Sequence, residues 1–198
     1  GTRDGNRVDL VTISSCNGID MDEKEPLFDS IFPEAKSDGS SRPHAFPEKQ
    51  ILWISGLVHP GEVPAQHTIK GIFKLLLDEG NVISQELRRR YVFKIVPMIN
   101  PDGVIRGHFR MDQFGQNLNR YYGTPDKDLQ GPIFAIKKLL DHYAERQKLA
   151  LYLDCHAHAS KRGCFIYGNV LDTIDDQVQN MLYCRLVALN TPHFDYEG

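Results

Sequence analysis

The chain has 198 residues, of which 41% are hydrophobic and 25% are charged, and its formal net charge is −3. This length can form one sizeable domain with a buried core, and the composition is ordinary for a soluble globular protein. The small net charge gives no indication of a nucleic-acid or membrane partner, and no apolar run reaches the length of about 18 residues that a membrane-spanning helix needs.

The first half of the chain predicts two strands, a long loop and a helix. Residues 6–14 alternate and are rich in β-forming side chains, which predicts a strand. Residues 15–49 hold acids, Ser, Gly and Pro around a short apolar patch, and we interpret them as a surface loop inserted into the domain. Residues 50–56 are an apolar run that is typical of a buried strand. A helix after Glu62, with Gly80 as its C-cap, is predicted by apolar residues three and four apart: Ile69, Ile72, Phe73, Leu76 and Leu77.

The second half continues the alternation of strands and helices. This alternation predicts an α/β protein with a mixed, mainly parallel sheet and helices on both faces. Residues 104–124 show no steady period but carry several polar side chains. The other predicted elements are a basic turn at 87–90, a strand at 91–97, a tight turn at 100–103, a helix at 131–146, a strand at 149–155, a short strand at 164–167 and a last helix around 178–189.

Histidines and a glutamate follow two of the predicted strands. His59 and Glu62 stand three residues apart after the strand at 50–56, joined by a Pro-Gly turn. A catalytic zinc ion commonly takes two histidines and one carboxylate and keeps a position open for water. Either His156 or His158, which flank Ala157 at the end of another strand, suits the third ligand position. Ligand sites in such sheets lie at the carboxyl ends of strands, which is where these residues stand.

Four polar motifs follow one another along the chain, namely His59-Pro60-Gly61-Glu62, Asn100-Pro101-Asp102-Gly103-Val104, Asn117-Leu118-Asn119-Arg120 and His156-Ala157-His158-Ala159-Ser160. In this order they resemble the motifs of the zinc metallocarboxypeptidases, and within that family the chain is similar to the cytosolic carboxypeptidases. Residues 93–103 and 160–169 resemble the branch that removes branch-point glutamates from tubulin. The resemblance covers nearly the whole chain except residues 15–49.

The resemblance implies a zinc carboxypeptidase fold that lacks its C-terminal part, so that residues 1–198 form a partial catalytic domain. It implies one zinc ion bound by His59, Glu62 and His156, and it leaves His158 outside the ligand set. At position 117 this sequence has Asn where digestive members carry an Asp that orients the first zinc histidine. An amide oxygen still accepts a hydrogen bond from the imidazole, but it donates less electron density toward the metal.

The resemblance also implies how substrate is held. Asn119 and Arg120 match the pair that grips the terminal carboxylate of the substrate, a task that suits the planar fork of a guanidinium. Arg110 matches the arginine that polarises the scissile carbonyl. The implied partners are polyglutamylated tubulin or other acidic protein tails, and the implied compartment is the cytoplasm. Four cysteines without a C-x-x-C spacing agree with reduced thiols there.

Two alternatives stay open. No residue after His156 matches the glutamate that serves the family as general base, so we expect this chain to bind zinc with little or no turnover. The same departure permits a non-catalytic fragment or isoform that binds acidic tails through basic residues, namely Arg106, Arg110, Lys161 and Arg162. A zinc amidase that acts on N-acyl amino acids would use the same kinds of zinc ligand, although the Asn119-Arg120 pair argues against it.

Overall fold

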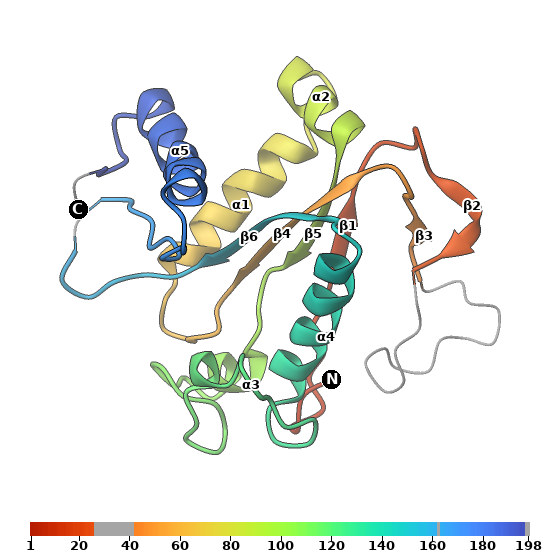
Figure 1. Ribbon diagram of the computed structural model, residues 1–198. Helices are drawn as coiled ribbons and strands as arrows, with labels where there is room; N and C mark the ends of the chain where they lie inside the picture. Colours follow the sequence, from red (N-terminus) through yellow and green to blue (C-terminus); the bar gives the residue numbers. More distant parts are fainter. Residues whose placement is uncertain (26–41, 162, 197–198) are drawn as a thin grey trace. The chain divides into compact units, whose positions relative to one another are not determined.

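The computed structural model describes residues 1–25, 42–161 and 163–196, which form two compact units, Gly1–Ala157 and His158–Gly198 (Figure 1). Among these residues no helix is long and apolar enough to cross a membrane. The elements are β1 (Val11–Ile13), β2 (Asp20–Lys24), β3 (His44–Ala45), β4 (Gln50–Gly56), α1 (Pro64–Leu76), α2 (Val82–Arg90), β5 (Tyr91–Val96), α3 (Pro101–Ile105), the 3-10 helix η1 (Leu118–Arg120), α4 (Gly131–Glu145), β6 (Leu149–Cys155) and α5 (Ile174–Asn190).

A four-stranded sheet in the order β1-β5-β4-β6 organises the first unit. Strand β4 runs parallel to both β5 and β6, and β1 joins β5 in the antiparallel direction. Helices α1 and α4 lie on opposite sides of this sheet (Figure 1). The predicted α/β class with a mixed, mainly parallel sheet and helices on both faces is therefore confirmed.

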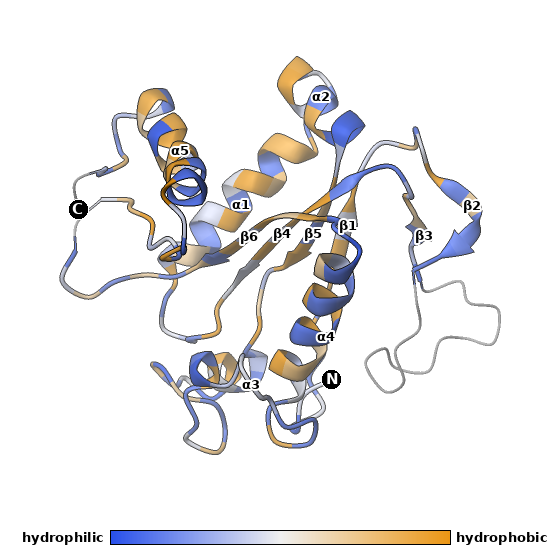
Figure 2. Ribbon diagram, viewed as in Figure 1, coloured by the Kyte–Doolittle hydropathy of each residue, from blue (hydrophilic) through white to orange (hydrophobic). Residues whose placement is uncertain are grey.

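Each face of the sheet has its own apolar core. Trp53 of β4 is fully buried and packs with Ile136 and other residues of α4 on one face. Ile69 of α1 packs on the other face, in a cluster that includes Cys155 at the end of β6. The polar and apolar residues that alternate along α4 in Figure 2 follow from this one-sided burial. As a consequence, the Cys155 side chain points to the α1 face of the sheet, opposite to the face toward which the adjacent side chain along the strand points.

The strands and helices with strong apolar patterns form where the sequence predicts them. This holds for β4, β5, β6, α1, α4 and α5. The strand predicted at 6–14 is shorter, since β1 covers Val11–Ile13 alone. The predicted loop at 15–49 contains the paired strands β2 and β3, so the prediction of a segment without elements is wrong, while its residues 26–41 lie outside the described part of the chain. Residues 164–167 make an isolated bridge through Cys164 instead of the predicted strand.

Two segments that were predicted to be turns are helices. Residues 87–90 belong to α2, whose N-cap Asn81 accepts hydrogen bonds from two main-chain N–H groups and whose Glu86 pairs with Arg89 and Arg90. Residues 100–103 open α3, because Asn100 caps the main-chain N–H of Gly103 and Pro101 suits the first helical turn. The helix α1 ends before Leu77, so the prediction of Gly80 as its C-cap is also wrong.

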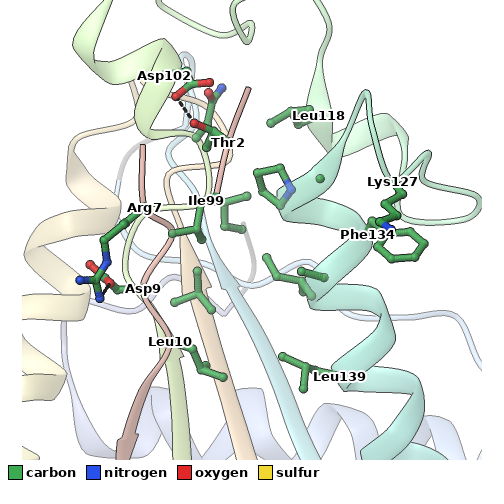
Figure 3. A pocket seen from close by; sticks show the side chains of 18 of the residues that line it. Thr2, Arg7, Asp9, Leu10, Ile99, Asp102, Leu118, Lys127, Phe134 and Leu139 are labelled. Atoms are coloured by element: carbon green, nitrogen blue, oxygen red, sulfur yellow. Dashed lines mark hydrogen bonds and ion pairs between the residues drawn. The ribbon is translucent and has the colours of Figure 1, made fainter. Parts of the chain in front are cut away.

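A cavity of about 820 Å³ lies between the N-terminal segment and α4 (Figure 3). Leu10 and Leu139 line it from opposite sides. The Lys94 ammonium at its wall pairs with Glu25 at 3.0 Å, and Glu25 also accepts a 2.8 Å hydrogen bond from the Tyr143 hydroxyl. None of the predicted metal ligands is among the described residues that line this cavity, so it is separate from the candidate site.

Candidate metal centre

Three predicted ligands come together at the carboxyl ends of two neighbouring parallel strands. His59 and Glu62 lie in the turn between β4 and α1, and His156 directly follows β6. One carboxylate oxygen of Glu62 is 2.8 Å from Nδ1 of His59, and the other is 2.9 Å from Nδ1 of His156. The donor atoms of the three residues all lie within 4.8 Å of one another. The sequence prediction that these side chains converge is therefore met.

The three side chains fit a zinc ion by donor type and by spacing. Zinc bonds of about 2.0–2.2 Å in tetrahedral geometry separate ligand atoms by about 3.4 Å, which the observed grouping accommodates with small side-chain movements. Both imidazoles turn Nδ1 inward toward Glu62 and use Nε2 for a hydrogen bond elsewhere. Metal-binding histidines use their two ring nitrogens in this way, because the hydrogen bond at the nitrogen that does not face the metal, here Nε2, fixes the tautomer and the ring orientation.

His59 is held from behind by Asn117. The side chain of His59 is 2% exposed, and its Nε2 is 2.9 Å from Oδ1 of Asn117. The same amide oxygen accepts a hydrogen bond from the main-chain N–H of Asn119, which starts the short helix η1. The amide thus takes the position that the sequence analysis expected, as a neutral acceptor behind the first histidine.

His156 is held from behind by a carboxylate that the sequence analysis did not single out. Its Nε2 is 2.8 Å from one oxygen of Asp154, and the other oxygen of Asp154 accepts a 2.8 Å hydrogen bond from the Ser55 hydroxyl. Ser55 and Asp154 are direct partners in the parallel register of β4 and β6. The available signal was the spacing of two residues between Asp154 and His156, which places both side chains on one face of a strand.

The electrostatic setting of His156 follows from these neighbours. Burial of the imidazole opposes its protonation, but the hydrogen bond and negative charge of Asp154, together with Glu62, outweigh burial and raise the pKa of His156. Glu62 is itself fixed by a 2.9 Å hydrogen bond from the main-chain N–H of Ala157. Two carboxylates therefore face the two imidazoles, an arrangement that favours a bound cation.

The backbone around His59 is set by close contacts rather than by regular structure. Leu57 adopts φ 52°, a left-handed conformation that residues other than glycine rarely take and that is often found at functional sites. The Asn100 side chain donates hydrogen bonds to the main-chain oxygens of Val58 and Met111. It thereby ties the turn that carries His59 to the loop that carries Arg110, a role that was not predicted for the Asn-Pro-Asp-Gly motif.

Arg110 lies at the edge of the three-residue group, and the other two predicted substrate residues lie farther along the chain. The Arg110 guanidinium is 3.6 Å from a carboxylate oxygen of Glu62 and is 40% exposed. Asn119 and Arg120 belong to η1, two and three residues beyond the amide that holds His59, and Arg120 is exposed. Among the described residues no hydrogen bond links either side chain to the three ligands. Asn119 lines a hollow of about 380 Å³ whose wall includes Asp154.

The other basic residues named from the sequence that the structure describes, and the second histidine, have local partners of their own. Arg106 forms a two-point ion pair with Asp4, so it is not a free cation. His158 begins the second unit, where its ring makes edge contacts with Phe165 and Tyr167. Lys161 lies over the ring of Phe165, while the basic residue that follows it, at position 162, lies outside the described residues.

Comparison with known proteins identifies the family of the chain. The sequence pattern of the zinc carboxypeptidase family matches residues 2–131. The chain is 32% identical to cytosolic carboxypeptidase-like protein 5 of Danio rerio and 34% identical to that of Homo sapiens, in each case over 98% of its own length. It spans about a third of the length of these relatives, namely 32% of the first and 31% of the second. The fold is similar to that of a metallo-carboxypeptidase from Burkholderia cenocepacia, with a TM-score of 0.75 and 22% identity over 98% of this chain and 45% of the other.

Proposed function

The chain belongs to the zinc carboxypeptidase family, and from this premise we propose that it is part of the catalytic domain of an enzyme that hydrolyses glutamate from polyglutamylated protein tails such as those of tubulin. The observation that carries the proposal is the convergence of donor atoms from His59, Glu62 and His156 within 4.8 Å. In this proposal residues 15–49 are an insertion in the domain.

The metal in this proposal is a single zinc ion held by the three converging residues. Bound zinc supplies Lewis acidity, which polarises a carbonyl and lowers the pKa of water to about 7. With zinc bound, Nδ1 of His59 and Nδ1 of His156 would face the ion, and their Nε2–H groups would donate to Asn117 and Asp154. Glu62 supplies the carboxylate and is kept in place by the main chain of residue 157.

Arg110 is proposed to stabilise the negative charge that develops on the carbonyl oxygen of the scissile amide. The distance of 3.6 Å between its guanidinium and Glu62 supports this role, because it puts a cation beside the proposed metal ligands. A fixed cation at this position stabilises the transition state more than the substrate, because the charge it faces grows during the reaction.

Asn119 and Arg120 are proposed to bind the carboxylate of the departing glutamate. The short helix η1 carries both, and its start is fixed by Asn117, which also holds His59. The arginine fork makes two parallel hydrogen bonds with a carboxylate, and the neighbouring amide adds a further donor. The contacts of Asn117 with both His59 and the main-chain N–H of Asn119 support this proposal, because they connect η1 to the proposed metal site.

The choice of glutamate tails as substrate rests on the sequence resemblance of residues 93–103 and 160–169 to the tubulin-deglutamylating branch. The cytoplasm is proposed as the compartment because the relatives at 32–34% identity are named cytosolic carboxypeptidases.

Hydrolysis also needs a base that takes a proton from water and delivers it to the leaving amine. We propose that the 198 residues alone bind zinc but turn over little substrate, because no residue after His156 matches the family's glutamate motif.

The test combines metal analysis with a peptidase assay. The purified chain is expected to contain about one zinc ion per molecule, and His59→Ala should lose it. A polyglutamylated peptide should be cleaved slowly or not at all by this chain. Rapid cleavage would refute the expected lack of a base, whereas a folded chain without zinc would refute the metal site itself.

A second candidate function is the binding of acidic tails without catalysis. The exposed guanidinium of Arg120 and the partly exposed one of Arg110 favour it, whereas the pairing of Arg106 with Asp4 weakens it. Binding of a polyglutamylated peptide that survives both His59→Ala and chelation would support this function. Binding that disappears with zinc would exclude it in favour of the hydrolase.

A further inference from the structure

The two imidazoles of the metal centre have matching geometry but chemically different supports. Nε2 of His59 lies 2.9 Å from a neutral amide oxygen of Asn117, and Nε2 of His156 lies 2.8 Å from a carboxylate oxygen of Asp154. A carboxylate acceptor makes an imidazole a more basic metal ligand than an amide does, because its negative charge draws the N–H proton outward.

We infer that Asp154, held by Ser55, is a positioning residue that raises the zinc affinity of this centre by acting through His156. In this chain the charged support acts on the histidine after β6, while the histidine after β4 has a neutral support. This inference rests on the proposed metal site and deepens it, because it names which outer residue sets the affinity of the site for zinc.

Both oxygens of the Asp154 carboxylate lie within hydrogen-bond distance of a neighbouring side chain. One of its oxygens accepts from the Ser55 hydroxyl at 2.8 Å and the other faces His156, so neither oxygen is free to rotate away. Ser55 is fully buried, and the Asp154 side chain is 12% exposed. Ser55 and Asp154 are partners in the parallel register of β4 and β6, so the regular sheet itself puts the Ser55 hydroxyl beside the Asp154 carboxylate. A rigid pair of this kind holds the imidazole in one orientation before any metal arrives.

The charge of Asp154 has no ordinary structural partner. Within the described ranges its ion-pair partner is His156, and no lysine or arginine is paired with it. A partly buried carboxylate needs a compensating positive charge, and the groups that face Asp154 from the site supply it. Glu62 and Asp154 bring two formal negative charges and Arg110, 3.6 Å from Glu62, brings one positive charge, so the group has a net negative charge that favours a bound cation. This charge argues that Asp154 acts on the metal site through His156.

The test compares zinc affinities by competition with a chromophoric chelator at fixed pH. Asp154→Asn should weaken zinc binding by about 10–100-fold, the usual effect of removing an outer partner of a metal ligand. The matched control is Asp141→Asn, which removes a carboxylate that pairs with Lys137 on α4 and touches neither histidine. It should leave zinc affinity unchanged. Ser55→Ala, which keeps the carboxylate but frees one oxygen, should weaken binding in the same direction by a smaller factor.

A relocation experiment separates tuning from mere structural support. Adding Asn117→Asp to Asp154→Asn moves the carboxylate from one histidine to the other and should restore zinc affinity to within a few-fold of the parent chain. Nitrogen NMR of the zinc-bound parent should show His156 protonated at Nε2. Thermal unfolding of the metal-free variants should differ little from the parent.

The outcomes separate the two proposals. If the parent chain binds no zinc, the proposed function fails. If the parent binds zinc and Asp154→Asn binds it as tightly as the Asp141→Asn control, only the present inference fails. An affinity loss that the relocated carboxylate does not restore, together with a lower unfolding temperature of the metal-free variant, would assign Asp154 a structural role and also overturn the inference.

Discussion

The main-chain oxygen of Phe109 accepts a 2.8 Å hydrogen bond from the N–H of Gly61. Through this bond the loop that carries Arg110 rests directly on the turn that carries His59 and Glu62. A Cβ atom at position 61 would lie 2.7 Å from that same oxygen and 2.7 Å from the ring of Phe109. The glycine is therefore required by the close approach of two loops, one with the proposed metal ligands His59 and Glu62 and one with the guanidinium of Arg110.

Gly61→Ala should destabilise the protein and separate these loops. Because the added methyl group meets a backbone atom that cannot rotate away, we expect a loss of about 1–3 kcal/mol in the free energy of unfolding. The control is Gly71→Ala in α1, where a new Cβ meets nothing within 4 Å and should stabilise the helix by about 0.5–1 kcal/mol. Urea unfolding curves of both variants provide the measurement, and equal stability of Gly61→Ala and the parent chain would contradict the close-approach argument.

Asn117→Ala should weaken zinc binding by removing the acceptor behind His59. The imidazole is almost fully buried, so its Nε2–H would lose its partner and the ring would lose its fixed orientation. A loss of about 10–100-fold in zinc affinity is expected. Asn190→Ala on α5 removes an exposed amide with only a main-chain partner and should have no effect. Chelator competition measures both; unchanged affinity of Asn117→Ala would mean that the amide does not support the metal ligand.

Breaking the buried ion pair of Lys94 should cost more than removing it whole. Glu25→Gln leaves the ammonium of Lys94 in a site where its side chain is 1% exposed, and about 3–5 kcal/mol of stability should be lost. The double variant Lys94→Met with Glu25→Gln should recover most of this loss, because no uncompensated charge remains. Chemical denaturation of the two single variants and the double variant gives the coupling free energy. Additive losses would show that the pair does not act as a unit.

Tyr143 should make the fold sensitive to alkaline pH. Burial of the phenol, with the charge of Glu25 as a second cause, raises the pKa of Tyr143 above the ordinary value of about 10. Its contribution to stability is therefore fully present below pH 10, and it is lost as pH rises above 10 because the unfolded chain gives up the proton first. Unfolding free energy should fall above pH 10, and the fall should be shallower in Tyr143→Phe. Tyr167→Phe, which removes an exposed phenol, should retain the slope of the parent chain.

The sequence predicts those elements whose burial is local and continuous. Strand β4 is a continuous apolar run and helix α4 has a helical period of apolar residues, each within one stretch of chain, and both form as predicted. Helix α2 escapes such a pattern because its Val82 and Ile83 are exposed, and its stability comes from a cap and ion pairs instead. The sequence predicts a turn where helix α3 forms, because Asn, Pro, Asp and Gly favour both a tight bend and a capped helix start.

The candidate site shows the same division. His59, Glu62 and His156 carry recognisable spacing and motifs, so their convergence was foreseeable. The contact of Ser55 with Asp154 depends on the register between β4 and β6, two strands that are far apart in the sequence. Side-chain spacing within one strand contains no information about that register. The Ser55 hydroxyl that holds Asp154 behind His156 therefore became visible only through the pairing of the sheet.

The register of β4 against β6 also has a consequence for the order of assembly. Glu62 and His156 are separated by 94 positions in the chain, and closing a loop of that length costs about 4 kcal/mol in chain entropy. Because residues 51–56 pair with residues 149–155, the sheet closes this loop before any ion is needed. The cation should therefore bind to a site that is already folded. Chelation should remove the metal without unfolding the chain, in contrast to small zinc domains, which unfold without their metal.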